Sequence, residues 1–228
     1  DQVPFTDGSE SNRGNKVTVD FLFYNFVNAC TAGAPDLTAD YMSYRKSAGN
    51  RKVLMGEVGV GPQSIWVPAS ALVARTTNGP ASATLESTTN KVMRKVLDFD
   101  AATDEFAQIE LQMPKSWNIS TITVIFVWEA SNTGNVVWGA QALCLSDDDA
   151  IDTAFGTAQT VTDGVTATTD VMRSAATAAI TASNTPAAQD LLILQVYRDA
   201  DNASDTCAVD ARLHGVLISY TTQTNTDT

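Results

Sequence analysis

The sequence has few positive charges, a single histidine and no long apolar segment. Its 14 Lys and Arg residues stand against 26 Asp and Glu residues, which gives a net charge of −12. An acidic surface without a basic stripe repels phosphate backbones, which argues against nucleic-acid binding. No apolar run reaches the roughly 18–20 residues that are needed to span a membrane. We therefore expect neither nucleic acid nor a membrane among the partners of this chain.

The cysteines and the histidine do not suggest a reactive site. Cys30, Cys144 and Cys207 are far apart in the chain, which argues against a disulfide framework and against a zinc site. We expect Cys144 and Cys207 to be small buried side chains, consistent with folding in a reducing cytoplasm. His214 lies in a strand-like stretch, and strand alternation does not put all three of Cys207, Asp210 and His214 on one face, so we expect no catalytic triad. The sequence predicts neither an enzyme nor a cofactor.

Alternating and β-branched segments dominate the chain from residue 64 onward. Residues 105–113 alternate between polar and apolar side chains, and residues 121–130 form a nearly continuous apolar run. Residues 135–145 follow after a short turn, which favours a hairpin of these two strands. The other expected strands are a short one that ends at Pro68 and the segments 91–99, 160–162, 171–172, 178–182, 190–200 and 211–222. Roughly eight to ten strands without a long amphipathic helix predict an antiparallel, jelly-roll-like β-sandwich.

The first 63 residues differ in composition from this sandwich domain, which we place at 64–228. Residues 1–16 are polar and rich in Gly, Ser and Asn, which predicts an extended arm. The apolar tip of the arm consists of Val3, Pro4 and Phe5. Residues 17–63 form an expected attachment segment, loop-like over 31–52. Its compact basic patch consists of Arg45, Lys46, Arg51 and Lys52. We expect the arm tip or this patch to make the attachment.

Two acidic stretches contain clustered Asp residues, which could supply some of the six to eight oxygen ligands that calcium needs. They are residues 147–152 and 199–210, and neither matches the EF-hand pattern of a Gly at the sixth and a Glu at the twelfth position. The calcium candidates are Asp199, Asp201 and Asp205. Turn and capping roles are the ordinary use of such residues, and we expect no bound metal.

Four tryptophans lie in or beside the expected strands. Trp128 and Trp138 are embedded in apolar runs, which favours packing in the core. Trp66 and Trp117 lie nearer to loops. These two are the candidates for exposed rings that stack on sugars.

Four segments between Ser64 and Tyr220 carry a family likeness. They are IWVPASALVARTTNGPA at 65–81, TTNKVMRKVLDFDAATDEFAQIELQMPKSWN at 88–118, VVWGAQALCLSDDDAIDTAFGTAQTVTD at 136–163 and QVYRDADNASDTCAVDARLHGVLISY at 195–220. In amino-acid sequence and in order along the chain, they resemble a family of virion-associated decoration and appendage proteins of marine tailed bacteriophages and prophages. The resemblance implies a structural protein of the virion, and it carries over no catalytic residue.

These observations leave three hypotheses. The first is a head decoration or spike protein attached to the phage capsid as an oligomer, expected to be a trimer. The second is a receptor-binding module of a head or tail fibre that stacks host-surface glycans on exposed aromatic rings. In both cases the chain belongs to the virion, assembles in the cytoplasm of the bacterial host and has capsid or appendage proteins as partners. The third and least favoured is a hydrolase of surface polysaccharide.

Overall fold

The computed structural model describes residues 41–46, 49–54, 60–168 and 170–224. The chain divides into two units, residues 1–60 and residues 61–228, and each is treated by itself. Within the described residues, no helix combines the length and the apolar character that crossing a membrane requires.

The described part of the first unit is an antiparallel hairpin of β1 (Tyr41–Lys46) and β2 (Gly49–Leu54). Lys46 pairs with Gly49, so only two residues connect the strands, and a glycine beside a two-residue connection is typical of hairpins. The predicted loop over 31–52 is therefore wrong where it overlaps these strands. The hairpin gives only a weak sequence signal, because the charged residues of both strands interrupt the apolar alternation that marks a half-buried strand.

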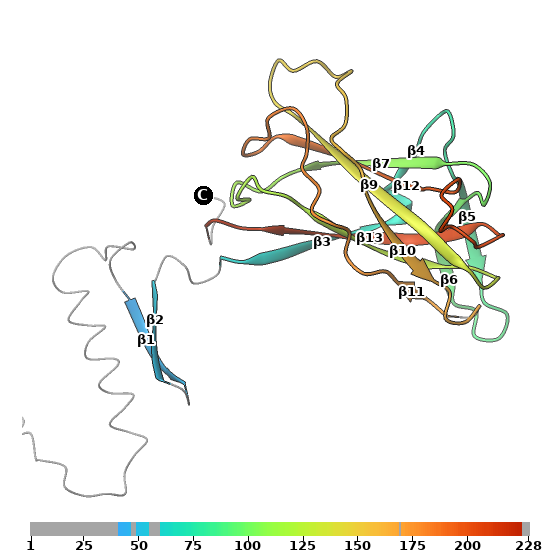
Figure 1. Ribbon diagram of the computed structural model, residues 1–228, viewed down its shortest axis with the longest axis horizontal. Coiled ribbons are helices and arrows are strands. Elements are labelled where there is room, and N and C mark those ends of the chain that lie inside the picture. Colours follow the sequence, from blue (N-terminus) through green and yellow to red (C-terminus); the bar gives the residue numbers. More distant parts are fainter. Residues whose placement is uncertain (1–40, 47–48, 55–59, 169, 225–228) are drawn as a thin grey trace, which may run out of the picture. The chain divides into compact units, whose positions relative to one another are not determined.

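The second unit is a β-sandwich of two antiparallel sheets (Figure 1). The strands of one sheet are β4 (Val73–Ala74), β7 (Glu105–Gln112), β9 (Asn135–Leu145), β10 (Gln159–Gly164) and β12 (Leu191–Arg198). Those of the other are β3 (Pro62–Pro68), β5 (Ala81–Glu86), β6 (Met93–Phe99), β8 (Thr123–Glu129), β11 (Met172–Arg173) and β13 (Ala211–Thr221). We call them the β9 sheet and the β13 sheet. Their orders are β10–β9–β12–β7–β4 and β11–β8–β13–β6–β5, with β3 also paired to β13.

This architecture is the all-β, jelly-roll-like sandwich that the sequence predicts. One expected pairing is wrong, because β8 and β9 belong to different sheets and form no hairpin. β8 pairs with β13 and β11, whereas β9 pairs with β10 and β12. The turn residues after β8 carry the chain across the sandwich, which buries the inner faces of both strands against each other.

An aromatic cluster fills the space between the sheets. Trp128, Trp138, Phe99 and Phe126 are fully buried, which confirms the core packing expected for the two tryptophans. The ring centroids of Phe126 and Trp138 lie 5.2 Å apart in a stacked arrangement, and the Phe99 ring meets Trp138 edge-on at 5.2 Å. Such pairs add about 0.5–1.5 kcal/mol each beyond the burial of their area.

β13 is the central strand of its sheet, and it pairs with three other strands. One of its edges pairs with β8, and the other pairs first with β6 and then with β3. The register with β8 shifts between Leu213 and Gly215, so His214 is the extra residue of a β-bulge. The bulge lies beside the end of β3, where Gly215 pairs with Pro68.

Candidate functional site

Trp66 stands on the outer face of the β13 sheet. Its neighbours Ile65 and Val67 on β3 pack against the core, and strand alternation turns Trp66 the other way. The side chain is 48 % exposed, which is unusual for a tryptophan. The structure thus places this predicted candidate where a ligand can reach it.

The indole of Trp66 lies on a glycine of the neighbouring strand. A Cβ atom added to Gly215 would come within 2.7 and 2.8 Å of two atoms of the Trp66 six-membered ring. Only glycine lets the ring approach the β13 backbone so closely. The six-membered ring therefore lies against the β13 backbone, while about half of the residue stays open to solvent. We call this arrangement the Trp66 platform.

Small hydroxyl side chains border the Trp66 platform along the strands. Ser64 on β3 pairs with Ser219 on β13, which pairs in turn with Thr123 on β8. The next row in register contains Trp66 itself, Leu217 and Ile125. The platform thus combines a flat aromatic ring, an aliphatic row and hydroxyl groups that both donate and accept hydrogen bonds.

An ion-pair cluster lies on the other side of Gly215. Glu129 is its centre: its Oε1 accepts a hydrogen bond from Arg94 Nη2 at 3.5 Å, and its Oε2 lies 3.3 Å from Arg94 Nε and 3.3 Å from His214 Nε2. Arg212 lies 3.5 Å from Asp98. Burial raises the pKa of Asp98, although the charge of Arg212 acts in the opposite direction. His214 thus contacts the central carboxylate of a network that joins β6, β8 and β13.

Trp117 is not a stacking residue, and that prediction is wrong. Its side chain is 1 % exposed and belongs to the core. The backbone N–H of Trp117 donates to Pro114 O at 3.0 Å in a tight turn, and the residue bridges to Thr222 beyond β13. This pairing of the two segments turns the indole inward, and residues so distant in sequence give no local signal for it.

Asp205, one of the three calcium candidates, is already used in a buried ion pair. Its Oδ1 lies 2.7 Å from Arg198 Nη2, and its Oδ2 accepts Arg198 Nε at 3.0 Å and the N–H of Val137 at 3.0 Å. The remaining guanidinium donors go to the carbonyl oxygens of Phe99, Val209 and Cys207. Asp205 therefore holds the loop after β12 in place, and its assignment as a calcium ligand is wrong.

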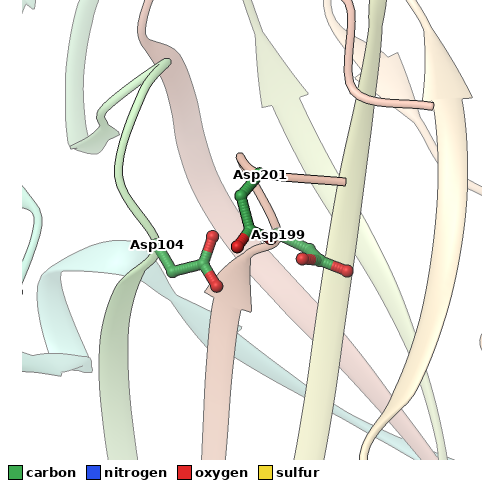
Figure 2. A group of neighbouring side chains, drawn as sticks. All are labelled: Asp104, Asp199 and Asp201. Carbon is green, nitrogen blue, oxygen red and sulfur yellow. The ribbon is translucent and has the colours of Figure 1, made fainter. Parts of the chain in front are cut away.

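The other two calcium candidates do come together. Asp199, Asp201 and Asp104 offer carboxylate oxygens within 4.8 Å of one another, and Figure 2 shows their side chains gathered between the start of β7 and the loop after β12. Asp104 Oδ1 accepts the N–H of Ala200 at 2.7 Å, and Asp199 Oδ2 accepts Asn202 Nδ2 at 2.8 Å. These three residues are the group that could hold a cation, and calcium would need further oxygens from carbonyls or water.

Asp104 was not among the predicted candidates, because it lies far from the other two carboxylates in the chain. Its one signal is its position directly before the alternating segment 105–113, since residues at the ends of paired strands meet across the sheet. Of the attachment candidates, the arm tip lies outside the described residues. The basic patch falls on the β1–β2 hairpin, where Tyr44 pairs with Arg51 and Ser43 pairs with Lys52.

No protein-family model and no curated protein matches the sequence. Among solved structures, a family 35 carbohydrate-binding module from Clostridium thermocellum is 11 % identical, with a TM-score of 0.42 over 68 % of this chain and 97 % of that one. The family 35 module of Abf62 from Cellvibrio japonicus is 9 % identical, with a TM-score of 0.39 over 70 % and 98 %. A structure of infectious bursal disease virus, Gx strain, is 12 % identical, with a TM-score of 0.36 over 79 % of this chain and 37 % of that one. At these values nothing about binding is transferred to this chain.

Proposed function

We propose that this chain is a non-catalytic glycan-binding protein of a bacteriophage virion, and that it binds sugar on the Trp66 platform. The observation that carries the proposal is the 48 % exposed Trp66, whose six-membered ring lies against Gly215 of the neighbouring strand. A tryptophan that has no role in the core, and that a neighbouring strand immobilises, has already lost the rotamer freedom that binding would otherwise cost.

The surroundings of Trp66 fit a sugar better than a purely apolar ligand. A sugar ring has an apolar C–H face that can lie on the indole, and its hydroxyl groups need donors and acceptors at the edge. The Ser64, Ser219 and Thr123 row offers such groups two residues along the strands, on the same face. A buried tryptophan contact at the centre of an interface contributes about 2 kcal/mol or more.

The virion setting rests on the sequence resemblance between residues 65 and 220 and supports two arrangements. As a receptor-binding module, the chain would contact host-surface glycans through many weak sites at once, and such multivalency raises avidity without new contacts. As a head decoration or spike protein, it would be attached by the arm or by the basic residues of the β1–β2 hairpin. The Trp66 platform supports the receptor-binding arrangement, because an exposed aromatic ring bordered by hydroxyl groups suits stacking on a glycan.

A binding assay with two variants tests the proposal. The chain is screened against immobilised host-surface polysaccharides, and Trp66→Ala is compared with Ile151→Ala, which removes an 85 % exposed apolar side chain from a loop. We expect the Trp66 variant to lose binding by roughly 30-fold, the equivalent of about 2 kcal/mol, and the control to bind as the wild type does. Equal binding by both variants would exclude the Trp66 platform as the site.

Phage adsorption distinguishes the two arrangements. Excess purified chain blocks adsorption of the phage to its host if the chain contacts the receptor, and the Trp66→Ala variant then fails to block. A pure decoration protein leaves adsorption unchanged. Particles would carry it in hundreds of copies, whereas a fibre module is present in a few dozen or fewer, a difference that a cryo-EM map of the particle resolves.

A further inference from the structure

The β9 sheet also carries a hollow with a mixed polar and apolar lining on its outer face, on the opposite side of the sandwich from Trp66. Its volume is about 640 Å³, within the usual range of small-molecule sites. Its wall is the chain from Val73 to Thr77, and its floor is the part of β7 around Gln108 and Glu110. Ile109 packs against the core, so alternation turns Gln108 and Glu110 outward.

The wall of the hollow is held in place before any ligand arrives. The N–H of Arg75 donates to Phe106 O at 3.0 Å, and the N–H of Phe106 donates to Asn78 O at 2.8 Å. The Arg75 guanidinium lies 4.6 Å from the centroid of the Phe106 ring, a cation–π contact that fixes its orientation. The ion pairs found among the described residues do not include Arg75, so its N–H donors stay available to a ligand.

The floor of the hollow is part of a polar ladder across the sheet. Gln108 Nε2 donates to Gln195 Oε1 at 2.8 Å, and Gln195 is only 4 % exposed. Two residues further along the same face, Phe106 pairs with Tyr197, and their rings stack with centroids 5.2 Å apart. A pair of amides in the middle of a sheet face fixes which groups Gln108 presents, and an amide both donates and accepts hydrogen bonds.

The charges around the hollow define the class of ligand. Arg75 and Glu110 give the lining one positive and one negative side chain, and Thr76 and Thr77 add two hydroxyl groups. This mixture of donors and acceptors suits the hydroxyl groups of a neutral sugar.

The far side of the aromatic pair repels anions. Asp104 and Asp199 lie beyond Tyr197, and the pKa of the Tyr197 hydroxyl is raised by its burial and by these two carboxylates. The two carboxylates themselves, which lie close together with Asp201, give this end of the outer face a negative potential. A sulfated or carboxylated sugar would therefore be disfavoured.

We infer that the hollow is a second carbohydrate site, specific for a neutral, hydroxyl-rich oligosaccharide segment that Arg75, Gln108 and Glu110 hold by hydrogen bonds. The inference rests on the proposed function for its ligand class, but it assigns a separate site on the opposite sheet. With a stacking site on one face and a hydrogen-bonding site on the other, one chain holds two sugar segments and can link neighbouring glycan chains. Two linked sites raise the avidity for a polymer without any new contact.

The test is isothermal titration of the full chain with neutral hexasaccharides of gluco, xylo, manno and galacto configuration. We expect two binding events with a hexasaccharide that binds. A variant with both Arg75→Met and Glu110→Gln should weaken one event at least 10-fold, and Trp66→Ala should remove the other. Lys115→Met, which removes an exposed charge outside the hollow, is the matched control, and thermal melts confirm that all variants are folded.

The possible outcomes separate this inference from the proposed function. A single event that Trp66→Ala abolishes and that the Arg75 and Glu110 variant leaves unchanged overturns the second site and keeps the Trp66 platform. A single event with the reverse pattern overturns the platform and supports the hollow. Tighter binding of a sulfated or carboxylated analogue than of its neutral counterpart, lost on Arg75→Met, overturns the assignment of a neutral ligand. No binding to any hexasaccharide or polysaccharide overturns both sites.

Discussion

Replacing Asp205 by Ala should destabilise the sandwich strongly, because it leaves the Arg198 guanidinium buried without its counter-ion. The Arg198 side chain is 0 % exposed and that of Asp205 is 2 % exposed. Removing one partner of such a pair costs about 3–5 kcal/mol. For a domain of 150–250 residues, 1 kcal/mol corresponds to about 2–4 °C in Tm, so we expect Asp205→Ala to melt about 6–20 °C below the wild type.

The assay is thermal and urea unfolding of the wild type and the variant, each with calcium and with a chelator. Chelation should leave both melting temperatures nearly unchanged, because we expect no bound metal and Asp205 binds Arg198. Asp147→Ala, which removes an exposed carboxylate outside the Asp104, Asp199 and Asp201 group, is the control and should shift stability by less than about 0.5 kcal/mol. Replacing both Arg198 and Asp205 by apolar residues should cost less than Asp205→Ala alone. A variant as stable as the wild type, or a loss that calcium restores, would refute this reasoning.

Three further predictions follow from other parts of the chain. Deleting residues 1–16 should leave a folded sandwich, seen by circular dichroism, that no longer joins particles lacking the protein; normal incorporation would place the attachment elsewhere. Burial raises the pKa of the Cys144 thiol to about 12, so in a Cys30→Ser background neither Cys144 nor the buried Cys207 should react with Ellman's reagent until the protein unfolds. Burial also raises the pKa of Glu105 above 4.5. The wild type should therefore lose stability relative to Glu105→Gln as the pH rises from 4.5, and an unchanged difference in Tm across that range would contradict this.

Strand positions could be predicted from the sequence where the alternation is strong and local. The expected strand 135–145 coincides with β9, and 105–113 ends one residue beyond β7. The weak segment 178–182 forms only an isolated bridge, in which Ile180 pairs with Ile122. Its N–H and carbonyl groups both bond to Ile122, and its small neighbours add little apolar surface to extend the pairing.

Partner choice could not be predicted, because it depends on contacts between distant segments. Strands β8 and β9 are adjacent in sequence and strongly apolar, which locally favours a hairpin. Both bury an inner face, however, and a sandwich gains more when these faces meet across the core than when they lie side by side. Contacts between distant segments also determine which of the two candidate tryptophans is exposed and which is buried. Trp66 has core-facing neighbours that turn it outward, whereas Trp117 lies in a turn whose orientation is set by Thr222.

On both outer faces of the sandwich, an aromatic ring lies over a glycine of the neighbouring strand. A Cβ atom on Gly215 would come within 2.7 Å of the Trp66 ring, and one on Gly139 would come within 2.2 Å of the Tyr197 ring. A glycine inside a strand is destabilising by roughly 0.5–1 kcal/mol, and an aromatic ring from the next strand compensates by covering the exposed backbone. The ring is thereby fixed on the sheet surface before a ligand binds, which lowers the entropic cost of binding. An interior strand glycine is visible in the sequence as a sign of close approach, but the ring that covers it is identified only by the strand register.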